Sequence, residues 1–195
     1  MNTLNTTMID NISYNKVLFI HVPKTGGTSI SHFLLNNNMD QWIRGYPFRH
    51  DPYFFMETNN NITKDTFTFS VVRNPYTRAY SYYKHFNYQN NLNYSFNKFL
   101  LLVKEKVSFP KTPMIIFPQS FYLLDRNKKI KLSKIYKFEN LKEFEKDFKT
   151  RIPHLMKGIY DKNEYYKDYT EDNISLVQDI YNEDFNLLNY SFKFL

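Results

Sequence analysis

The sequence predicts a single-domain α/β fold with a central parallel sheet flanked by helices. Two short apolar runs are each followed by a turn and then by apolar residues at helical spacing, and a third strand is expected later in the chain. Strands that alternate with helices in this way build parallel sheets. The length of 195 residues suits one domain, and 42% hydrophobic with 23% charged residues is the composition of a globular protein.

The first strand is expected over residues 17–20, which are apolar and partly β-branched. We interpret residues 1–15 before it as a flexible N-terminal arm and residues 16–195 as the folded domain. A turn with two glycines follows the strand. Ile30 and Phe33 then begin an apolar series at helical spacing, which predicts a helix.

The second strand is expected over residues 66–72 and stops before Arg73. Pro75 is suited to the first position of a helix, because it lacks the N–H that would be unpaired there. Aromatic residues recur at helical spacing from Tyr76 to Tyr83. The order strand, turn, helix is therefore repeated.

The later elements follow from the same patterns. A third strand is expected over residues 134–138, and further helices over residues 96–106, 118–124, 141–149 and 171–181. Asn140 and Glu143 have the spacing of a capping box. Thr170 is expected to cap the last helix.

Charge and composition limit the classes of ligand. The net charge of +7 and the pI of about 9.3 suit an anionic ligand. The basic residues are dispersed, which argues against dedicated nucleic-acid binding. Without cysteine there is no disulfide, no cysteine-based metal site and no thiol nucleophile. The polar N-terminus has no signal-peptide pattern and no apolar run could span a membrane, so we expect a cytoplasmic or otherwise soluble protein.

The turn after the first strand is a natural anion site. Its two glycines let the backbone approach a phosphate closely, and the N–H groups of the following helical turn point at the anion. The expected contacts are Lys24, Thr25, Gly26, Gly27, Thr28 and Ser29. The P-loop of ATPases has its lysine after the second glycine, followed by a Ser or Thr for Mg²⁺. Here Lys24 precedes both glycines, so the turn is not that motif.

A second anion site is expected after the second strand. Arg73 follows the carboxyl end of that strand, where open α/β sheets bind ligands, and a guanidinium can grip a phosphate bidentately. Ser81 lies eight residues later, under two helical turns from Pro75. Arg73 and Ser81 are therefore predicted to share a phosphate apart from the first loop.

These two motifs together resemble those of the 3′-phosphoadenosine-5′-phosphosulfate (PAPS)-dependent sulfotransferases, and the first resembles their carbohydrate branch. The resemblance implies a P-loop-like sulfotransferase fold, with the first loop on the 5′-phosphosulfate and Arg73 and Ser81 on the 3′-phosphate. It also implies a late basic loop, for which Lys157 is the candidate; a solvated lysine is the alternative reading. Arg78 fits the motif, either as a site residue or in a structural salt bridge. Weaker likeness extends to residues 117–120, 137–141 and 181–185.

The implied reaction transfers a sulfuryl group from PAPS to an acceptor hydroxyl, with no metal required. Lys24 is suited to stabilise charge on the leaving oxygen. In relatives the base lies between the two motifs, so His50 is our candidate, with Glu57 and His85 as alternatives. His21 could face either the site or the core. The branch implies a carbohydrate acceptor, and a small alcohol or a tyrosyl peptide stays open.

Two other functions are compatible with a phosphate-binding turn. One is a P-loop-like nucleotide-dependent phosphotransferase, against which the position of Lys24 argues. The other is a non-catalytic nucleotide-binding module, which would need no base and would tolerate the loss of Lys24.

Overall fold

A computed structural model describes residues 7–9, 12–37, 50–59, 62–107, 117–152 and 165–194. The chain forms two compact units, each built from two separate segments. The first unit comprises Met1–Val72 and Phe121–Met156, and the second comprises Arg73–Ser120 and Lys157–Leu195. From the sequence, one domain was predicted over residues 16–195. Each unit has a hydrophobic core of its own, which periodicity along the chain does not reveal.

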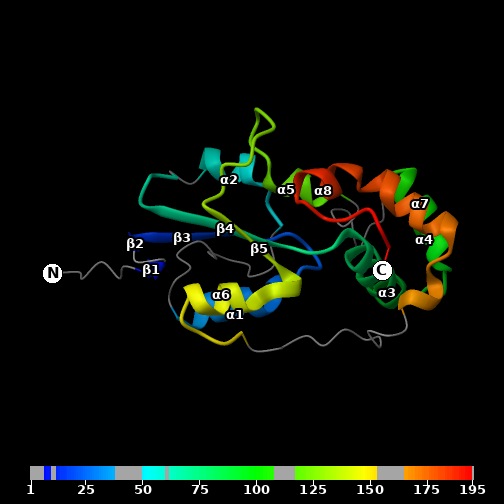
Figure 1. The fold of residues 1–195 in the computed structure, drawn as a ribbon, viewed down its shortest axis with the longest axis horizontal. Helices are drawn as coiled ribbons and strands as arrows, with labels where there is room; N and C mark the ends of the chain where they lie inside the picture. Colours follow the sequence, from blue (N-terminus) through cyan, green and yellow to red (C-terminus); the bar gives the residue numbers. More distant parts are fainter. Residues whose placement is uncertain are drawn as a thin grey trace. The chain divides into compact units, whose positions relative to one another are not determined.

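The first unit contains the predicted parallel sheet (Figure 1). Its strands are β3 (Lys16–Ile20), β4 (Thr66–Val72) and β5 (Lys134–Lys137), with β4 in the centre. Both pairings are parallel, so the three strands end at the same edge. All seven residues of β4 are buried, as expected for a central strand of a covered sheet.

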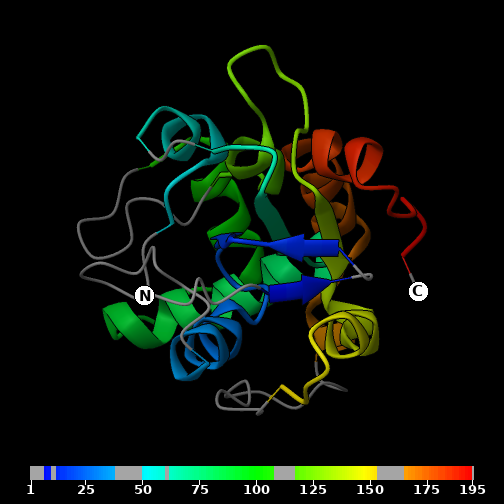
Figure 2. The same cartoon turned by 90° about the vertical axis from the view of Figure 1, so that its left-hand side faces the viewer.

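Helices flank this sheet, which confirms the predicted α/β class. The helices α1 (Gly27–Asn36) and α6 (Leu141–Asp147) lie on one face, and α2 (Tyr53–Asn59) lies on the other (Figures 1 and 2). The core under α1 and α6 is rich in aromatic side chains. It comprises Ile9, Val17, Phe19, Ile30, Phe33, Leu34, Phe67, Phe69, Val71, Tyr136, Phe144, Phe148 and Ile152.

Residues 7–9 and 12–14, within the segment predicted to be a flexible arm, form two strands. Strands β1 (Thr7–Ile9) and β2 (Ile12–Tyr14) form an antiparallel pair, drawn in front of the sheet in Figure 2. Ile9 is buried in the core of the first unit, and the Tyr14 ring lies 5.1 Å from the Phe67 ring. These apolar contacts hold the segment on the domain.

The start of α6 also differs from the prediction. A short 3-10 helix, η1 (Phe138–Asn140), precedes it, and the Asn140 side chain accepts no capping hydrogen bond. Glu143 is paired instead with Lys134, at 3.2 Å. The capping-box assignment was therefore wrong, because the carboxylate has a stronger partner on β5.

The second unit is helical. Its elements are α3 (Pro75–Asn90), α4 (Phe96–Lys104), η2 (Tyr165–Asp168), α7 (Glu171–Ile180) and α8 (Asn182–Leu187). Pro75 opens α3 and Thr170 caps α7, both as predicted. The core is built mainly of tyrosine and phenylalanine from α3, α4 and the C-terminal helices.

The remaining helix, α5 (Gln119–Leu123), spans the point where the chain passes from the second unit to the first. Among the described residues, no helix is both long and apolar enough to cross a membrane.

Candidate functional site

The loop between β3 and α1 ends in an unusual helix start. Gly26 is the N-cap of α1 and adopts the left-handed conformation, with φ 83°. It has no side chain to accept from the first turn, whereas side chains cap α3, α4 and α7. The first turn of α1 also contains no acidic residue. A helix start of this kind presents N–H groups and the positive end of the helix dipole, both of which favour an anion.

Both glycines of the loop are required by packing, and Gly26 is also required by its backbone conformation. A Cβ on Gly26 would lie 2.9 Å from the ring of Phe138, the first residue after β5. A Cβ on Gly27 would lie 2.0 Å from Cδ2 and 2.1 Å from Nε2 of His21. The loop is therefore held between two aromatic rings, and only glycine fits at either position.

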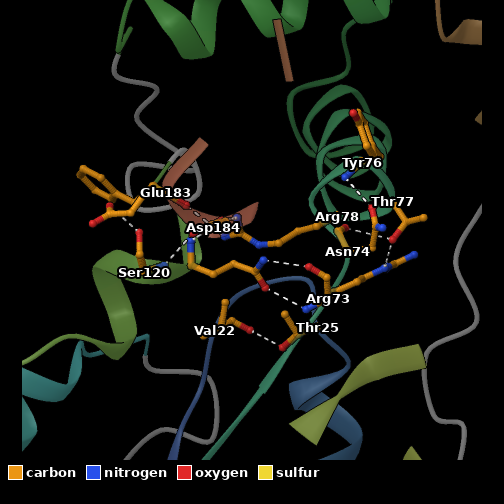
Figure 3. A network of polar contacts seen from close by, with 12 residues as sticks. Val22, Thr25, Arg73, Asn74, Tyr76, Thr77, Arg78, Ser120, Glu183 and Asp184 are labelled. Atoms are coloured by element: carbon orange, nitrogen blue, oxygen red, sulfur yellow. Dashed lines mark hydrogen bonds and ion pairs between the residues drawn. The ribbon is translucent and has the colours of Figure 1, made fainter. Parts of the chain in front are cut away.

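Lys24 and Thr25 shape the rest of the loop. Lys24 also has a positive φ, 66°, which costs a non-glycine residue about 1 kcal/mol and must be held by its surroundings. The buried Thr25 hydroxyl donates to the Val22 carbonyl at 2.8 Å (Figure 3). This hydroxyl therefore closes the loop, whereas the sequence analysis expected it to contact the anion. Lys24, Thr28 and Ser29 are half-buried.

His50 lies against the residue that supports this loop. Its ring centroid is 4.3 Å from that of His21, and its Nδ1 is 2.9 Å from the His21 carbonyl oxygen. A carbonyl oxygen only accepts, so Nδ1 of His50 is the donor in this contact. A neutral imidazole in this tautomer has its lone pair on Nε2.

His21 faces the core. It is buried and its ring stacks on Phe19, with centroids 5.4 Å apart. Burial lowers the pKa of His21 well below its ordinary value, and the neighbouring His50 lowers it further. Its Nδ1 is buried without a hydrogen-bond partner. His21 therefore stays neutral and serves as a packing surface for Gly27 and His50.

The two alternative bases lie elsewhere. Glu57, on α2, forms an ion pair with Lys131 at 3.4 Å, and Lys131 is also 3.0 Å from Asp125. This cluster links α2 to the turn after α5, which is a structural use for the Glu57 carboxylate. His85 lies on α3 in the second unit. Of the two candidates in the first unit, His50 lies against His21, whereas Glu57 is paired with Lys131.

Arg73 is held at both its main chain and its side chain. Its N–H donates to Oε1 of Gln119 and its carbonyl accepts from Nε2 of Gln119, each at 2.8 Å. Its Nε donates to the Thr77 hydroxyl at 3.0 Å. Ser81 is one turn beyond Thr77, so Arg73 is anchored to the helix face that also carries Ser81.

Arg78 has the structural role that was one of its two readings (Figure 3). Its side chain is 1% exposed, lies 3.9 Å from Asp184 and donates to the Phe117 carbonyl at 3.1 Å. The Asp184 carboxylate accepts from the N–H groups of Gln119 and Ser120, each at 2.8 Å. Burial raises the pKa of Asp184, against the opposing influence of Arg78 and these N–H groups.

Lys157 lies outside the described residues. The described part of the chain contains no group of three or more His, Asp or Glu side chains that could hold a metal ion. Sequence reasoning missed three residues that support the two loops: Phe138, Thr77 and Gln119. It left His21 open between the site and the core. Phe138 and Gln119 belong to the segments 137–141 and 117–120, for which the sequence offered only a weak resemblance.

No family model, curated protein or solved structure matches this chain.

Proposed function

We propose that this protein is a PAPS-dependent sulfotransferase that acts on a hydroxyl group, with a carbohydrate as the acceptor. The observation that carries the proposal is the start of α1, where a glycine-built, uncapped helix end follows a parallel strand and a lysine. Arg73, anchored on α3 in the second unit, supports it, because a nucleotide with a separate 3′-phosphate requires a second cation.

In this proposal each motif binds a different phosphate group of the nucleotide. Residues 24–29 fit the 5′-phosphosulfate, since backbone N–H groups and the Lys24 ammonium both favour an anion. Arg73 and Ser81 fit the 3′-phosphate, because a guanidinium binds phosphate bidentately and a serine adds a hydroxyl donor. The leading rival is a P-loop-like phosphotransferase, which would have its lysine after the second glycine.

The residues of the chain then have distinct chemical roles. When bound, PAPS would supply a sulfuryl group whose bond to the 5′-phosphate oxygen breaks as the acceptor oxygen bonds to sulfur. Nε2 of His50 accepts the proton that the acceptor hydroxyl loses. Lys24 stabilises the electron pair left on the phosphate oxygen. These roles require no metal ion.

Calorimetric titration of the nucleotide site tests this proposal. Adenosine 3′,5′-bisphosphate, the product of PAPS, should bind at least about tenfold more tightly than ADP, or about 1.4 kcal/mol. Arg73→Ala should weaken the bisphosphate more than Ser81→Ala, because a charged bidentate contact exceeds one neutral hydrogen bond. Equal affinities for the two nucleotides would refute the proposal and favour the phosphotransferase.

A transfer assay separates an enzyme from a binding module. Radiolabelled PAPS should yield a labelled product with at least one member of a panel of sugars and small alcohols. Tight bisphosphate binding without turnover on any acceptor would favour a non-catalytic nucleotide-binding module.

A further inference from the structure

The side-chain amide of Gln119 forms two hydrogen bonds with the main chain of a single residue, Arg73. Oε1 accepts from the Arg73 N–H and Nε2 donates to the Arg73 carbonyl, both at 2.8 Å. The Gln119 side chain is fully buried. A flipped amide would oppose donor to donor and acceptor to acceptor, so only one orientation is stable. Gln119 therefore determines where the Arg73 side chain begins.

Gln119 is itself held by buried polar groups of the second unit. Its N–H and that of Ser120 each donate to one oxygen of Asp184, and Arg78 lies beside the same carboxylate. The hydroxyl of Ser120 also donates to Glu183 at 2.8 Å. Figure 3 shows these groups converging from α3, α5 and α8. Burying a carboxylate with a guanidinium is costly, and its well-attested benefit is to impose one specific arrangement.

The side chain of Arg73 is held in turn by Thr77. The Thr77 hydroxyl accepts from Nε of Arg73 at 3.0 Å and lies 3.2 Å from the Asn74 carbonyl, to which it donates. Because the Thr77 hydroxyl donates its hydrogen to the Asn74 carbonyl, its oxygen can accept from Nε of Arg73. The guanidinium is thus directed along α3 by a residue one turn away.

We infer that Gln119 and Thr77 are positioning residues that hold Arg73 in the geometry that grips the 3′-phosphate of the nucleotide. This inference rests on the proposed function. The two residues make no contact with the ligand in this role; they fix the main chain and the Nε of the arginine that does. Prepositioning of this kind favours binding because the side-chain entropy is lost before the ligand arrives.

The test compares two nucleotides that differ in the 3′-phosphate. Affinities for adenosine 3′,5′-bisphosphate and adenosine 5′-monophosphate are measured by calorimetry for the full chain and for Gln119→Met and Thr77→Val. We expect each variant to lower the ratio of bisphosphate to monophosphate affinity by about tenfold. This factor corresponds roughly to the free energy of one hydrogen bond at a charged group. Affinity for the monophosphate should change less than about threefold.

Two matched variants separate positioning from general damage to the fold. Thr77→Ser keeps the hydroxyl and should keep the preference. Gln178→Met removes two comparable bonds in the same unit, to the Tyr76 hydroxyl at 2.8 Å and the Phe192 carbonyl at 2.9 Å, and should leave the preference unchanged. If Gln119→Met does not fold, the result for Thr77→Val alone tests the positioning role.

The outcomes distinguish this inference from the proposed function. If the parent protein prefers the bisphosphate but Thr77→Val keeps that preference, the positioning role is wrong and the proposed function stands. An equal loss of affinity for both nucleotides in the variants also overturns the positioning role. If the parent protein itself shows no preference, the proposed function fails and the inference fails with it.

Discussion

The contact between Gly27 and His21 gives a sharp prediction for Gly27→Ala. The new Cβ would lie 2.0 Å from Cδ2 of His21, where ordinary contacts begin at 3.4 Å. The ring must therefore retreat by more than 1 Å, but Phe19 and His50 occupy its other sides. Overpacking of this kind costs about 1–3 kcal/mol, and the better helix propensity of alanine returns at most about 1 kcal/mol. We expect a net loss of about 1–2 kcal/mol in the free energy of unfolding.

A double-mutant cycle isolates the cause of that loss. In a His21→Ala background the ring is gone, so Gly27→Ala should be neutral or stabilising, with a coupling energy of about 2 kcal/mol. Urea unfolding of the four proteins measures it. Gly26→Ala is the control: its cost comes from φ 83° and from Phe138, and should persist in both backgrounds. The same penalty for Gly27→Ala with and without the His21 ring would refute the steric account.

Three further predictions concern stability, pH and rate. Asp184→Ala removes the carboxylate beside the buried Arg78 guanidinium and the acceptor of the Gln119 and Ser120 N–H groups, so it should cost about 3–5 kcal/mol in urea unfolding. Lys104→Ala, which breaks an exposed ion pair at 2.8 Å, should cost less than about 1 kcal/mol; similar losses for both would contradict this reasoning. Burial lowers the pKa of His21, so at acidic pH the unfolded chain binds a proton that the folded protein does not bind. The free energy of unfolding is therefore highest above about pH 6.5 and decreases on acidification. The parent should lose about 1.4 kcal/mol more than His21→Asn between pH 7.5 and 5.5, and parallel pH curves would show that His21 does not titrate this way. In the transfer assay His50→Ala should lower the rate by about 10²-fold or more and leave the bisphosphate affinity unchanged. Lys24→Ala should lower the turnover rate more than it weakens bisphosphate binding. Full activity of His50→Ala would assign the base to another residue.

Local signals in the sequence were sufficient for the strands and helices that lie next to the two loops. The apolar runs before Lys24 and Arg73 are the parallel strands β3 and β4, and Pro75 opens α3. These features depend on residues within a few positions of one another, so periodicity and capping preferences reveal them.

The supports of the loops depend on contacts between residues that are distant in sequence. Gln119 is 46 residues from Arg73, and His50 is 29 residues from His21. Nothing around Gln119 indicates that its amide will bond to another segment's backbone. The hydrogen bond from the Thr25 hydroxyl to the Val22 carbonyl, three residues away, is a local contact that the sequence analysis did not consider.

The pairing of β1 with β2 and the two separate cores are not evident from the sequence. Strands β1 and β2 have three residues each, too short for a clear alternation of polar and apolar positions. The second core is rich in tyrosine, whose hydroxyl makes it ambiguous as a marker of burial. Arg78 shows the same ambiguity, because a charged residue is rarely expected to be 1% exposed.

The interleaving of the two units has a consequence for synthesis on the ribosome. The chain passes between them after Val72, after Ser120 and after Met156. The sheet of the first unit lacks β5 until residue 137 has emerged, and the core of the second lacks Phe185 until α8 is made. Neither unit can therefore complete its core while most of the chain is still being translated. Strand β3 can pair with β4 once residue 72 has emerged, but the other edge of β4 lacks its partner β5 until later. Expression of either unit alone would require joining two segments that are not adjacent in the gene.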